Sequence, residues 1–307
     1  MDRTFSDIVK QGLRSVGHYR RALAHMSFPG VAALCYHGIR DEGMKPGTIP
    51  FQYLHMPAST FDAHCRVLRE CCDPISLDDW RAALSGGPAL PPRPVLITFD
   101  DGYRSVLLKA APILRKYSIP AAVFVCTGPM SRRTHLWFDE VGEREGEAAV
   151  ERWKAREYDA WSAACARTAA VDDCDPRALM TMEELSTLAA FGGIEIGGHT
   201  VNHPILARAS AAMQRYEIAE NLRSIEQSTG VRPRAFAYPN GRPNLDYNAD
   251  TVAILGENDI DIAFTTSPSF AGAAEPPLER SRFFLLDDTS DAELAHRLTY
   301  SWARQER

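Results

Sequence analysis

The sequence predicts an α/β fold, a barrel of alternating strands and helices. Short β-rich runs recur from residue 31 onward, and segments with helical periodicity separate them. A doubly wound sheet has the same alternation, but seven strands favour a barrel, in an incomplete form. The predicted strands cover residues 31–36, 95–99, 121–126, 194–197, 235–238, 260–266 and 282–286.

The predicted helices have recognisable ends. After Ser59, apolar residues recur at helical spacing. Thr181 and Glu184 have the spacing of a capping box and predict a helix over residues 182–190. A longer helix with an apolar stripe is expected to end at Gly230.

One stretch interrupts this alternation. Residues 131–180 are longer than an ordinary loop and rich in Trp, Arg, Glu and Ala, which predicts a mostly helical insertion. We therefore expect an N-terminal helical extension over residues 1–30, one domain over 31–290 that contains the insertion, and a C-terminal helix over 291–307.

The composition excludes several classes of protein. The chain has 307 residues, 45% hydrophobic and 24% charged, with a formal net charge of −6. No basic stripe indicates a nucleic-acid partner. No run of about 18 apolar residues predicts a transmembrane segment. The amino end lacks the apolar core of a signal peptide, and the seven cysteines lack CxxC spacing, so we expect reduced thiols and a cytoplasmic location. Residues 7–26 form a basic amphipathic pattern, which predicts a helix packed on the domain, with a membrane-surface helix as the alternative.

Two carboxylates follow a predicted strand in 95-VLITFDDGY-103. An Asp in this position is often only the N-cap of the next helix. However, His199 and His203 follow another predicted strand and lie four residues apart, a spacing that suits two ligands of one metal ion. With either Asp100 or Asp101 they complete a set of two His and one carboxylate, and the second Asp is free to act as a base.

Two further strand ends carry polar residues. His37 follows the first predicted strand, and a Pro-Asn-Gly turn follows the strand over 235–238. In barrels of parallel strands the active site forms at the carboxyl ends of the strands. These segments are therefore expected to converge, which favours a metal-dependent hydrolase over a structural role for the same residues.

The motifs TFDDG at 98–102 and HTVNH at 199–203 resemble the first two motifs of the polysaccharide deacetylases of the NodB-homology family, carbohydrate esterase family four. The likeness covers residues 31–290, with similar segments at 113–128, 137–141 and 262–266. The resemblance implies a distorted (β/α)7 barrel that uses a divalent metal, commonly zinc, to remove N-acetyl groups from sugars.

Carried over by position, the resemblance implies that Asp100 is the general base. It implies that Asp101, His199 and His203 hold the metal. Thr200 fills the hydroxyl position of the His motif, where it would steady the loop.

The third motif of the family departs from its usual form. Here it is AYPNG, in which Ala237 replaces an Arg that orients the base, and Asn240 replaces an aromatic residue. A backbone N–H near Asn240 is still expected to bind the oxyanion, and Arg280 or Arg282 is expected to tether Asp100 instead.

The general acid is also displaced. A late Leu-x-His occurs only as 294-LAH-296, inside the predicted terminal helix, where His296 is expected to be a surface residue. The early LCYHGI resembles the permuted branch of the family that acts on poly-N-acetylglucosamine, so we assign the acid to His37, with a structural core His as the alternative.

The expected substrate is an N-acetylated amino sugar of a polysaccharide, or its lipid-linked or nucleotide-linked precursor, with Trp137 and Tyr238 as stacking surfaces. Two nitrogens and one oxygen suit zinc, cobalt, nickel or iron comparably, and zinc comes first because the resemblance implies it. Formamide, cyclic imide or O-acetyl substrates need the same site, and an inactive scaffold homologue is a further alternative. The insertion is a candidate contact for a membrane surface or a glycosyltransferase.

Overall fold

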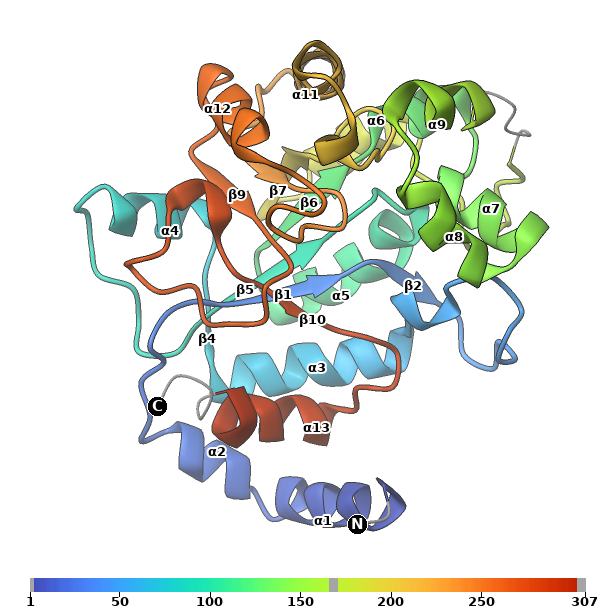
Figure 1. Cartoon of the computed structure of the whole chain (residues 1–307). Coiled ribbons are helices and arrows are strands. Elements are labelled where there is room, and N and C mark those ends of the chain that lie inside the picture. The colour runs from blue at the N-terminus through green and yellow to red at the C-terminus, as the bar shows by residue number, and fades with distance from the viewer. Residues whose placement is uncertain (1–2, 166–170, 303–307) are drawn as a thin grey trace.

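The computed structural model describes residues 3–165 and 171–302. Its centre is a curled, open sheet of parallel strands in the order β10-β1-β5-β6-β7-β8-β9, with the short β4 paired to β5 (Figure 1). Neighbouring strands are in register, as in the pairs Ala32 with Val95 and Ile97 with Ala121. The strands are β1 (Ala32–Tyr36), β4 (Asp73–Pro74), β5 (Pro94–Phe99), β6 (Ala121–Val125), β7 (Ile194–Gly198), β8 (Ala235–Ala237), β9 (Ile262–Phe264) and β10 (Phe283–Phe284).

The sheet closes only half of a barrel. Its edge strands β9 and β10 lie at opposite ends of the strand order and do not pair with each other. In the described part of the chain, an isolated β-bridge joins Phe264 of β9 to Arg280, which lies shortly before β10. The predicted α/β fold and its incomplete barrel are confirmed, and all seven predicted strands are present. The pair β2 (Gly38–Arg40) and β3 (His55–Pro57), and β4, were not predicted, because these segments contain Gly, Pro or charged residues and do not form a β-rich apolar run.

Side chains alternate between the two faces of the sheet. Two hydrophobic clusters lie on opposite faces of the sheet. On β5, Val95, Ile97 and Phe99 pack in the larger cluster, together with residues of α2, α3 and α13, whereas Leu96 packs in the smaller cluster on the other face. This alternation follows from the two-residue period of a strand. The smaller cluster contains Trp80, whose ring lies 5.7 Å from that of Phe264. It therefore fills the hollow face of the half-barrel.

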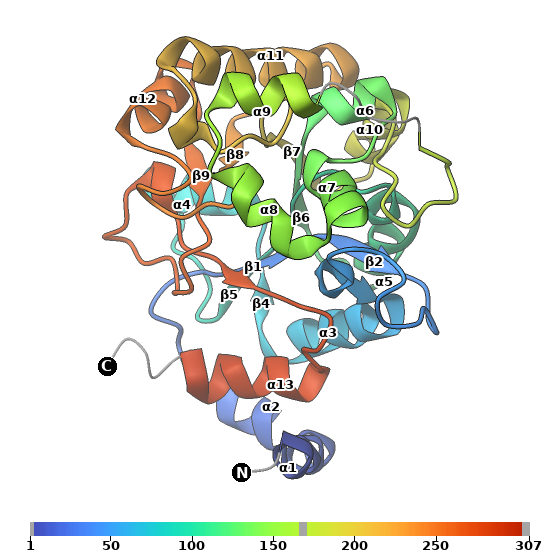
Figure 2. The ribbon, with the colours of Figure 1, turned by 45° about the vertical axis from the view of Figure 1, so that its right-hand side comes forward.

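Helices cover the sheet on two sides. Figures 1 and 2 show α3, α13 and α2 stacked on one side and α11 with α12 on the opposite side. Thr181 and Glu184 form the predicted capping box, with bonds of 3.2 and 3.1 Å, and α11 ends at Gly230, whose φ is 74°. The helices are α1 (Arg3–Ser15), α2 (His18–Leu23), α3 (Ala58–Cys71), α4 (Leu77–Leu84), α5 (Ala111–Tyr117), α6 (Thr127–Arg132), α7 (Trp137–Glu145), α8 (Glu147–Lys154), α9 (Tyr158–Cys165), α10 (Met182–Ala189), α11 (Ala211–Thr229), α12 (Ala249–Glu257) and α13 (Asp291–His296).

The two ends of the chain pack together. The single helix expected over residues 7–26 is divided into α1 and α2 at Gly17, whose φ is 70°. Lys10 of α1 forms an ion pair of 2.5 Å with Glu293 of α13. The amino-terminal helices thus pack on the domain, as the amphipathic pattern predicts. The C-terminal helix continues from α13 into a wider turn over Arg297–Ser301, and the end of the predicted segment, 303–307, lies outside the described residues.

The insertion is helical, as predicted: α7, α8 and α9 lie within it, and residues 166–170 fall outside the described chain. The thiols of Cys35, Cys65, Cys71, Cys72 and Cys126 are free and buried, as expected, whereas Cys174 is free but exposed. The side chain of Cys165 lies outside the described part.

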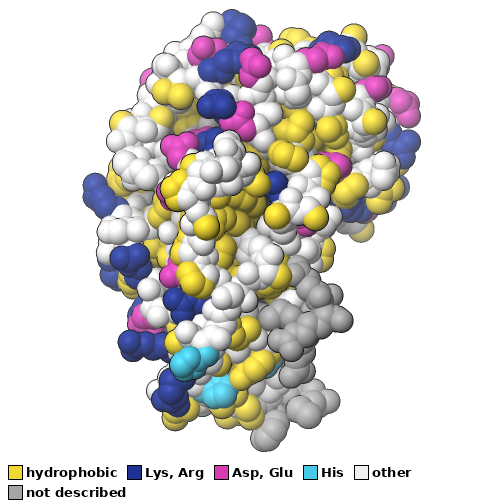
Figure 3. All heavy atoms as spheres, turned by 90° about the vertical axis from the view of Figure 1, so that its left-hand side faces the viewer, with side chains coloured by type: hydrophobic (Ala, Val, Ile, Leu, Met, Phe, Trp, Pro, Cys, Tyr) yellow, Lys and Arg dark blue, Asp and Glu magenta, His cyan; other side chains and the backbone are white. Residues whose placement is uncertain are grey.

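Among the described residues, no helix combines the length and the apolar character that a membrane crossing requires. Figure 3 shows basic and acidic side chains interspersed with apolar and neutral ones on the face it displays.

Candidate active site

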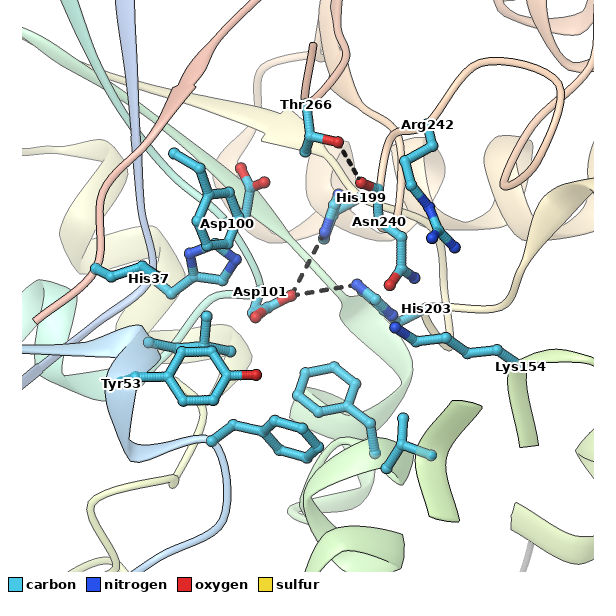
Figure 4. A pocket seen from close by; sticks show the side chains of 16 residues that line it. His37, Tyr53, Asp100, Asp101, Lys154, His199, His203, Asn240, Arg242 and Thr266 are labelled. Carbon is cyan, nitrogen blue, oxygen red and sulfur yellow. Dashed lines mark hydrogen bonds and ion pairs between the residues drawn. The ribbon is translucent and has the colours of Figure 1, made fainter. Parts of the chain in front are cut away.

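A pocket of about 490 Å³ lies at the carboxyl ends of the strands (Figure 4). His37 directly follows β1, Asp100 directly follows β5, and Thr266 follows β9 by two residues. Parallel strands end at one edge of the sheet, so these side chains converge as expected. The lining residues are His37, Phe51, Tyr53, Leu54, Asp100, Asp101, Phe138, Val150, Lys154, His199, His203, Asn240, Arg242, Thr266, Phe284 and Leu286.

Asp100 is buried and held by a guanidinium from the other end of the chain. Arg282 Nη1 donates to Oδ1 and Nη2 donates to Oδ2, each at 2.7 Å. Burial alone would raise the pKa of Asp100, but the charge of Arg282 holds it well below its ordinary value. Of the two arginines expected near this carboxylate, Arg282 is the tether, since Arg280 Nη1 donates to the Gly272 carbonyl instead.

Asp101 points away from this pair, toward the two histidines. Its Oδ1 lies 3.4 Å from His199 Nε2 and 3.5 Å from His203 Nε2 (Figure 4). This Oδ1 is buried and has no hydrogen-bond partner. One carboxylate oxygen and two imidazole nitrogens at this spacing suit zinc and similar divalent ions. The three residues therefore fit a metal ion.

The protonation of the two imidazoles agrees with this fit. His199 Nδ1 donates a hydrogen bond of 2.7 Å to the Ala237 carbonyl, which leaves Nε2 directed at Asp101. Burial opposes the charged form of His199, but the neighbouring carboxylates of Asp101 and Asp100 raise its pKa, so this position attracts positive charge. Burial lowers the pKa of His203 to about 3, which keeps this imidazole neutral. Thr200 Oγ1 accepts a bond of 2.9 Å from the His203 backbone N–H, the loop contact expected of it.

Asn221 on α11 orders the loop that carries His199 and His203, the candidate metal ligands, a role that the sequence did not predict. Its Oδ1 accepts from the His199 backbone N–H at 3.1 Å, and its Nδ2 donates to the Thr200 carbonyl at 2.6 Å and the Val125 carbonyl at 2.9 Å. The sequence does carry a signal: Gln214, Glu217 and Asn221 recur at helical spacing and are fully buried. A polar stripe on the buried side of a helix indicates a specific hydrogen-bond network.

The insertion holds the same loop from outside. Trp137 Nε1 donates to the His203 carbonyl at 2.8 Å. Tyr158 donates to Glu217 at 2.6 Å, and Glu217 also accepts from the Asn202 backbone N–H at 2.8 Å. The prediction that Trp137 forms a sugar-stacking surface is therefore wrong: its ring is buried and lies outside the pocket lining, where it supports the loop that carries His203.

The other predicted stacking residue is also misplaced. Tyr238 is buried, stacks on Tyr247 with ring centroids 3.8 Å apart, and donates to the Leu278 carbonyl at 2.8 Å. It packs between β8 and α12, outside the pocket lining. Phe51 and Tyr53, which the sequence analysis did not single out, line the pocket instead.

The backbone of the site is unusual. Nine described non-glycine residues have positive φ, and four of them line the pocket: Phe51, Asp101, His203 and Asn240. A fifth, Thr200, directly follows the lining residue His199. The left-handed region costs a side-chain-bearing residue about 1 kcal/mol or more. Such a concentration of strained residues is typical of functional sites.

His37 lies on the other side of Asp100. It is 8% exposed, and its ring centroid is 4.8 Å from that of Phe284. Burial lowers its pKa, against the attraction of Asp101 and Asp100. One of its ring nitrogens, the Cys35 thiol and an Asp100 oxygen all lie within 4.8 Å of one another. This second cluster is a poorer cation site, because both Asp100 oxygens are occupied by Arg282, whose charge repels a cation. His296 is half-buried at the end of α13 and lies outside the pocket lining.

Comparison with known proteins decides the family. The sequence profile described as "Polysaccharide deacetylase" matches residues 87–263, more than half of the chain. The chain belongs to the polysaccharide deacetylase family. Its similarity to other polysaccharide deacetylases extends beyond the matched segment. Poly-beta-1,6-N-acetyl-D-glucosamine N-deacetylase of Escherichia coli strain K12 is 24% identical over 286 residues, which cover 82% of this chain and 36% of that protein. The chain thus spans little more than a third of this relative.

Solved structures share the polysaccharide deacetylase fold seen here. The Streptococcus pyogenes deacetylase PplD, solved in complex with acetate, has a TM-score of 0.64 and 23% identity, and the match covers 88% of this chain and 98% of PplD. IcaB from Ammonifex degensii has a TM-score of 0.62 and 22% identity, over 91% of this chain and 99% of IcaB. At this identity the likeness concerns the fold.

Proposed function

We propose that the protein removes N-acetyl groups from an amino sugar in a metal-dependent hydrolysis. The observation that carries this proposal is the division of two adjacent carboxylates. Asp100 is bonded on both oxygens to Arg282, while Asp101 faces His199 and His203. One carboxylate is thereby suited to move a proton and the other to hold a cation, the two functions that metal-assisted amide hydrolysis needs.

Asp101, His199 and His203 would hold the metal ion, zinc in the first instance, with cobalt, nickel or iron as alternatives. When bound, such an ion acidifies water and polarises the acyl oxygen of the substrate. Asp100 is the general base in this proposal, because Arg282 keeps its carboxylate ionised and fixes its direction. His37 is the acid that protonates the departing amine, and its position beside Asp100 supports that role. Its place after β1 is the reason we group the chain with the branch that has an early Tyr-His.

The turn after β8 completes the proposed machinery. Asn240 has a φ of 59°, and its carbonyl accepts a bond of 2.6 Å from the Thr266 hydroxyl. This bond fixes the peptide next to the expected oxyanion N–H, so the donor is oriented before the substrate arrives. The Asn240 side chain also lines the pocket, and its Nδ2 is buried without a partner.

We infer that the substrate is an N-acetylated amino sugar of a polysaccharide or of its lipid-linked or nucleotide-linked precursor. The name of the E. coli relative supports this class. Phe51 and Tyr53 line the pocket and offer the aromatic faces that sugar rings favour. The cytoplasmic location and contact with a membrane surface or a glycosyltransferase stay predictions.

The test is acetate release from N-acetylglucosamine oligomers, with metal content measured on the same samples. Asp100→Asn should retain the metal and lose activity by a factor of about 10²–10⁴, because the base is gone. Asp101→Asn should lose both metal and activity. His37→Ala should retain the metal and show slow turnover, since only the proton donor is removed.

Each contrary outcome has a distinct meaning. Equal metal loss in both Asp variants would contradict the division of roles. Metal binding without release of acetate from any sugar would reject the deacetylase and leave an inactive scaffold or a formamide, cyclic imide or O-acetyl hydrolase. Full activity of His37→Ala would return His37 to a structural role.

A further inference from the structure

Two cationic side chains line the pocket and have no role in the proposed hydrolysis. Lys154 is the last residue of α8, and Arg242 lies in the loop after β8. Figure 4 shows both directed into the pocket, on the same side as Asn240 and His203. A neutral acetylated sugar needs neither charge for recognition, so their presence at the pocket requires another explanation.

The Arg242 guanidinium is held in a fixed direction. Its Nε donates to Asp246 Oδ2 at 2.8 Å and its Nη2 donates to Oδ1 at 2.9 Å. The Arg242 backbone N–H donates to the same carboxylate at 2.9 Å, and Asp246 is 1% exposed. A buried carboxylate therefore orients the guanidinium, while about half of the Arg242 side chain, 52%, stays accessible. An oriented guanidinium loses little conformational entropy when it binds an anion.

Lys154 lies on the same side of the pocket as the proposed metal site, since its side chain and that of His203 line the same pocket (Figure 4). Its ion-pair partner is Glu151, with Nζ 2.9 Å from Oε1, and this carboxylate is 68% exposed. Such an exposed pair contributes little energy, so the ammonium can exchange Glu151 for a stronger anionic partner.

The two cationic side chains line the pocket, whereas their carboxylate partners do not. Lys154 pairs with Glu151 and Arg242 pairs with Asp246, and neither carboxylate is among the lining residues. Of the two carboxylates that line the pocket, Asp100 is bonded to Arg282, and Asp101 faces His199 and His203. An anionic group of the substrate would therefore meet cationic groups on this side of the pocket.

We propose that Lys154 and Arg242 form an anion subsite, and that the substrate is an N-acetylated amino sugar bearing a phosphate group. This inference rests on the proposed function. Phosphate presents several charged oxygens, so it can accept from an ammonium and a guanidinium that come from different elements. The phosphate comes from a sugar 1-phosphate, a nucleotide diphosphate or a polyprenyl phosphate. Apolar residues that line the same pocket, Phe51, Leu54 and Leu286, would also contact a polyprenyl chain.

The experiment compares kcat/KM for acetate release from four N-acetylglucosamine compounds: the neutral methyl glycoside, the 1-phosphate, the uridine diphosphate form and a short-chain polyprenyl phosphate form. In the wild type we expect at least one phosphorylated form to be preferred over the glycoside. Lys154→Met and Arg242→Met should each lower that preference about tenfold, the loss expected for one charge-assisted bond. Glu151→Gln should raise it, because the competing carboxylate is gone.

A matched control is Lys116→Met. Lys116 also forms an ion pair with one well-exposed member, with Asp62 at 2.6 Å, and is not among the residues that line the pocket. Its removal should leave the preference unchanged. No preference in the wild type, or a preference that survives both pocket variants, would overturn the subsite.

Binding of N-acetylglucosamine 1-phosphate by calorimetry separates the subsite from the proposed chemistry. If no acetate is released from any compound but this ligand binds about tenfold more weakly to Lys154→Met and Arg242→Met, the deacetylase fails and the subsite stands. Equal binding by the wild type and both variants overturns the subsite, whatever the activity.

Discussion

Replacing Arg282 with Met tests the tether of the proposed base. The change keeps an unbranched apolar side chain about as long as the aliphatic part of Arg but removes the guanidinium and both 2.7 Å bonds to Asp100. It also removes the bond of 3.0 Å from Nε to the Thr265 carbonyl. The Arg282 side chain is 0% exposed and that of Asp100 is 5% exposed, so water cannot replace the lost partner at the surface.

The loss leaves an unpaired buried carboxylate. Breaking one side of a buried ion pair typically costs about 3–5 kcal/mol of unfolding free energy. Adding Asp100→Asn to Arg282→Met removes the stranded charge, so the double variant should be more stable than the sum of the two single changes predicts. We expect a coupling energy of about 1–3 kcal/mol between these residues in contact.

The same change should reverse the pH dependence contributed by Asp100. In the wild type its pKa lies below the ordinary 3.8, so its contribution to stability is present above 3.8 and is lost as the pH falls through the lower folded value. Without Arg282, burial dominates and raises the pKa above 3.8. The protonated form then stabilises the fold, and that contribution is lost as the pH rises toward neutrality. The destabilisation by Arg282→Met should therefore grow between pH 3.8 and neutrality.

Urea unfolding of the four proteins in this cycle, measured across that pH range, gives both quantities. Acetate release should also fall in Arg282→Met with metal retained, because the base has lost its direction. Additive free energies, or a destabilisation that does not change with pH, would refute the assignment of Arg282 as the partner of a charged Asp100.

Three further changes test the support of the loop that carries His199 and His203. Asn221→Asp removes the amide donor and should weaken metal binding about 10- to 100-fold, measured by competition with a chelator. Trp137→Phe removes the indole donor to the His203 carbonyl and should weaken metal binding by about tenfold, in the same assay. Gly198→Ala should lower the unfolding free energy by about 1–3 kcal/mol and also weaken metal binding, because the added Cβ would lie 2.7 Å from Asn221 Oδ1.

Gly230→Ala is the control for the last change. Gly230 has a φ of 74° and open space around its Cβ position, so this change strains only the end of α11. It should cost about 1 kcal/mol and leave metal binding intact. Normal metal affinity in all three loop variants would show that the observed hydrogen bonds do not position the ligands.

Much of the fold could be predicted because each central strand is a short apolar run between turn residues. The alternation of side chains within a strand also predicts on which face of the sheet Tyr238 lies. Ala235 and Ala237 face the hollow of the sheet, so Tyr238 must face α12 with Phe236, away from the pocket. The position of Trp137 could not be predicted in this way. It lies on a helix of the insertion, and the sequence does not show how that helix is oriented relative to the sheet.

The choice between Arg280 and Arg282 could not be made from the sequence. Residues two apart in an extended segment point in the same direction, so both were equally placed to reach Asp100. The pairing of Leu34 with Phe283 brings the segment of Arg282 next to β1, and β1 in turn pairs with β5, which ends at Asp100. This order of strands is a tertiary property that local patterns do not encode.

The strand order also sets when the site can form during synthesis. The ribosome releases Asp100 and both histidines long before Arg282, which lies 182 residues after its carboxylate partner. Until β10 docks beside β1, the Asp100 carboxylate lacks its guanidinium partner. Because burial of an unpaired charge is unfavourable, the carboxylate must remain hydrated until then. The emerging chain can therefore bring Asp101, His199 and His203 together before Arg282 is available, whereas Asp100, the proposed base, gains its partner only after β10 has docked.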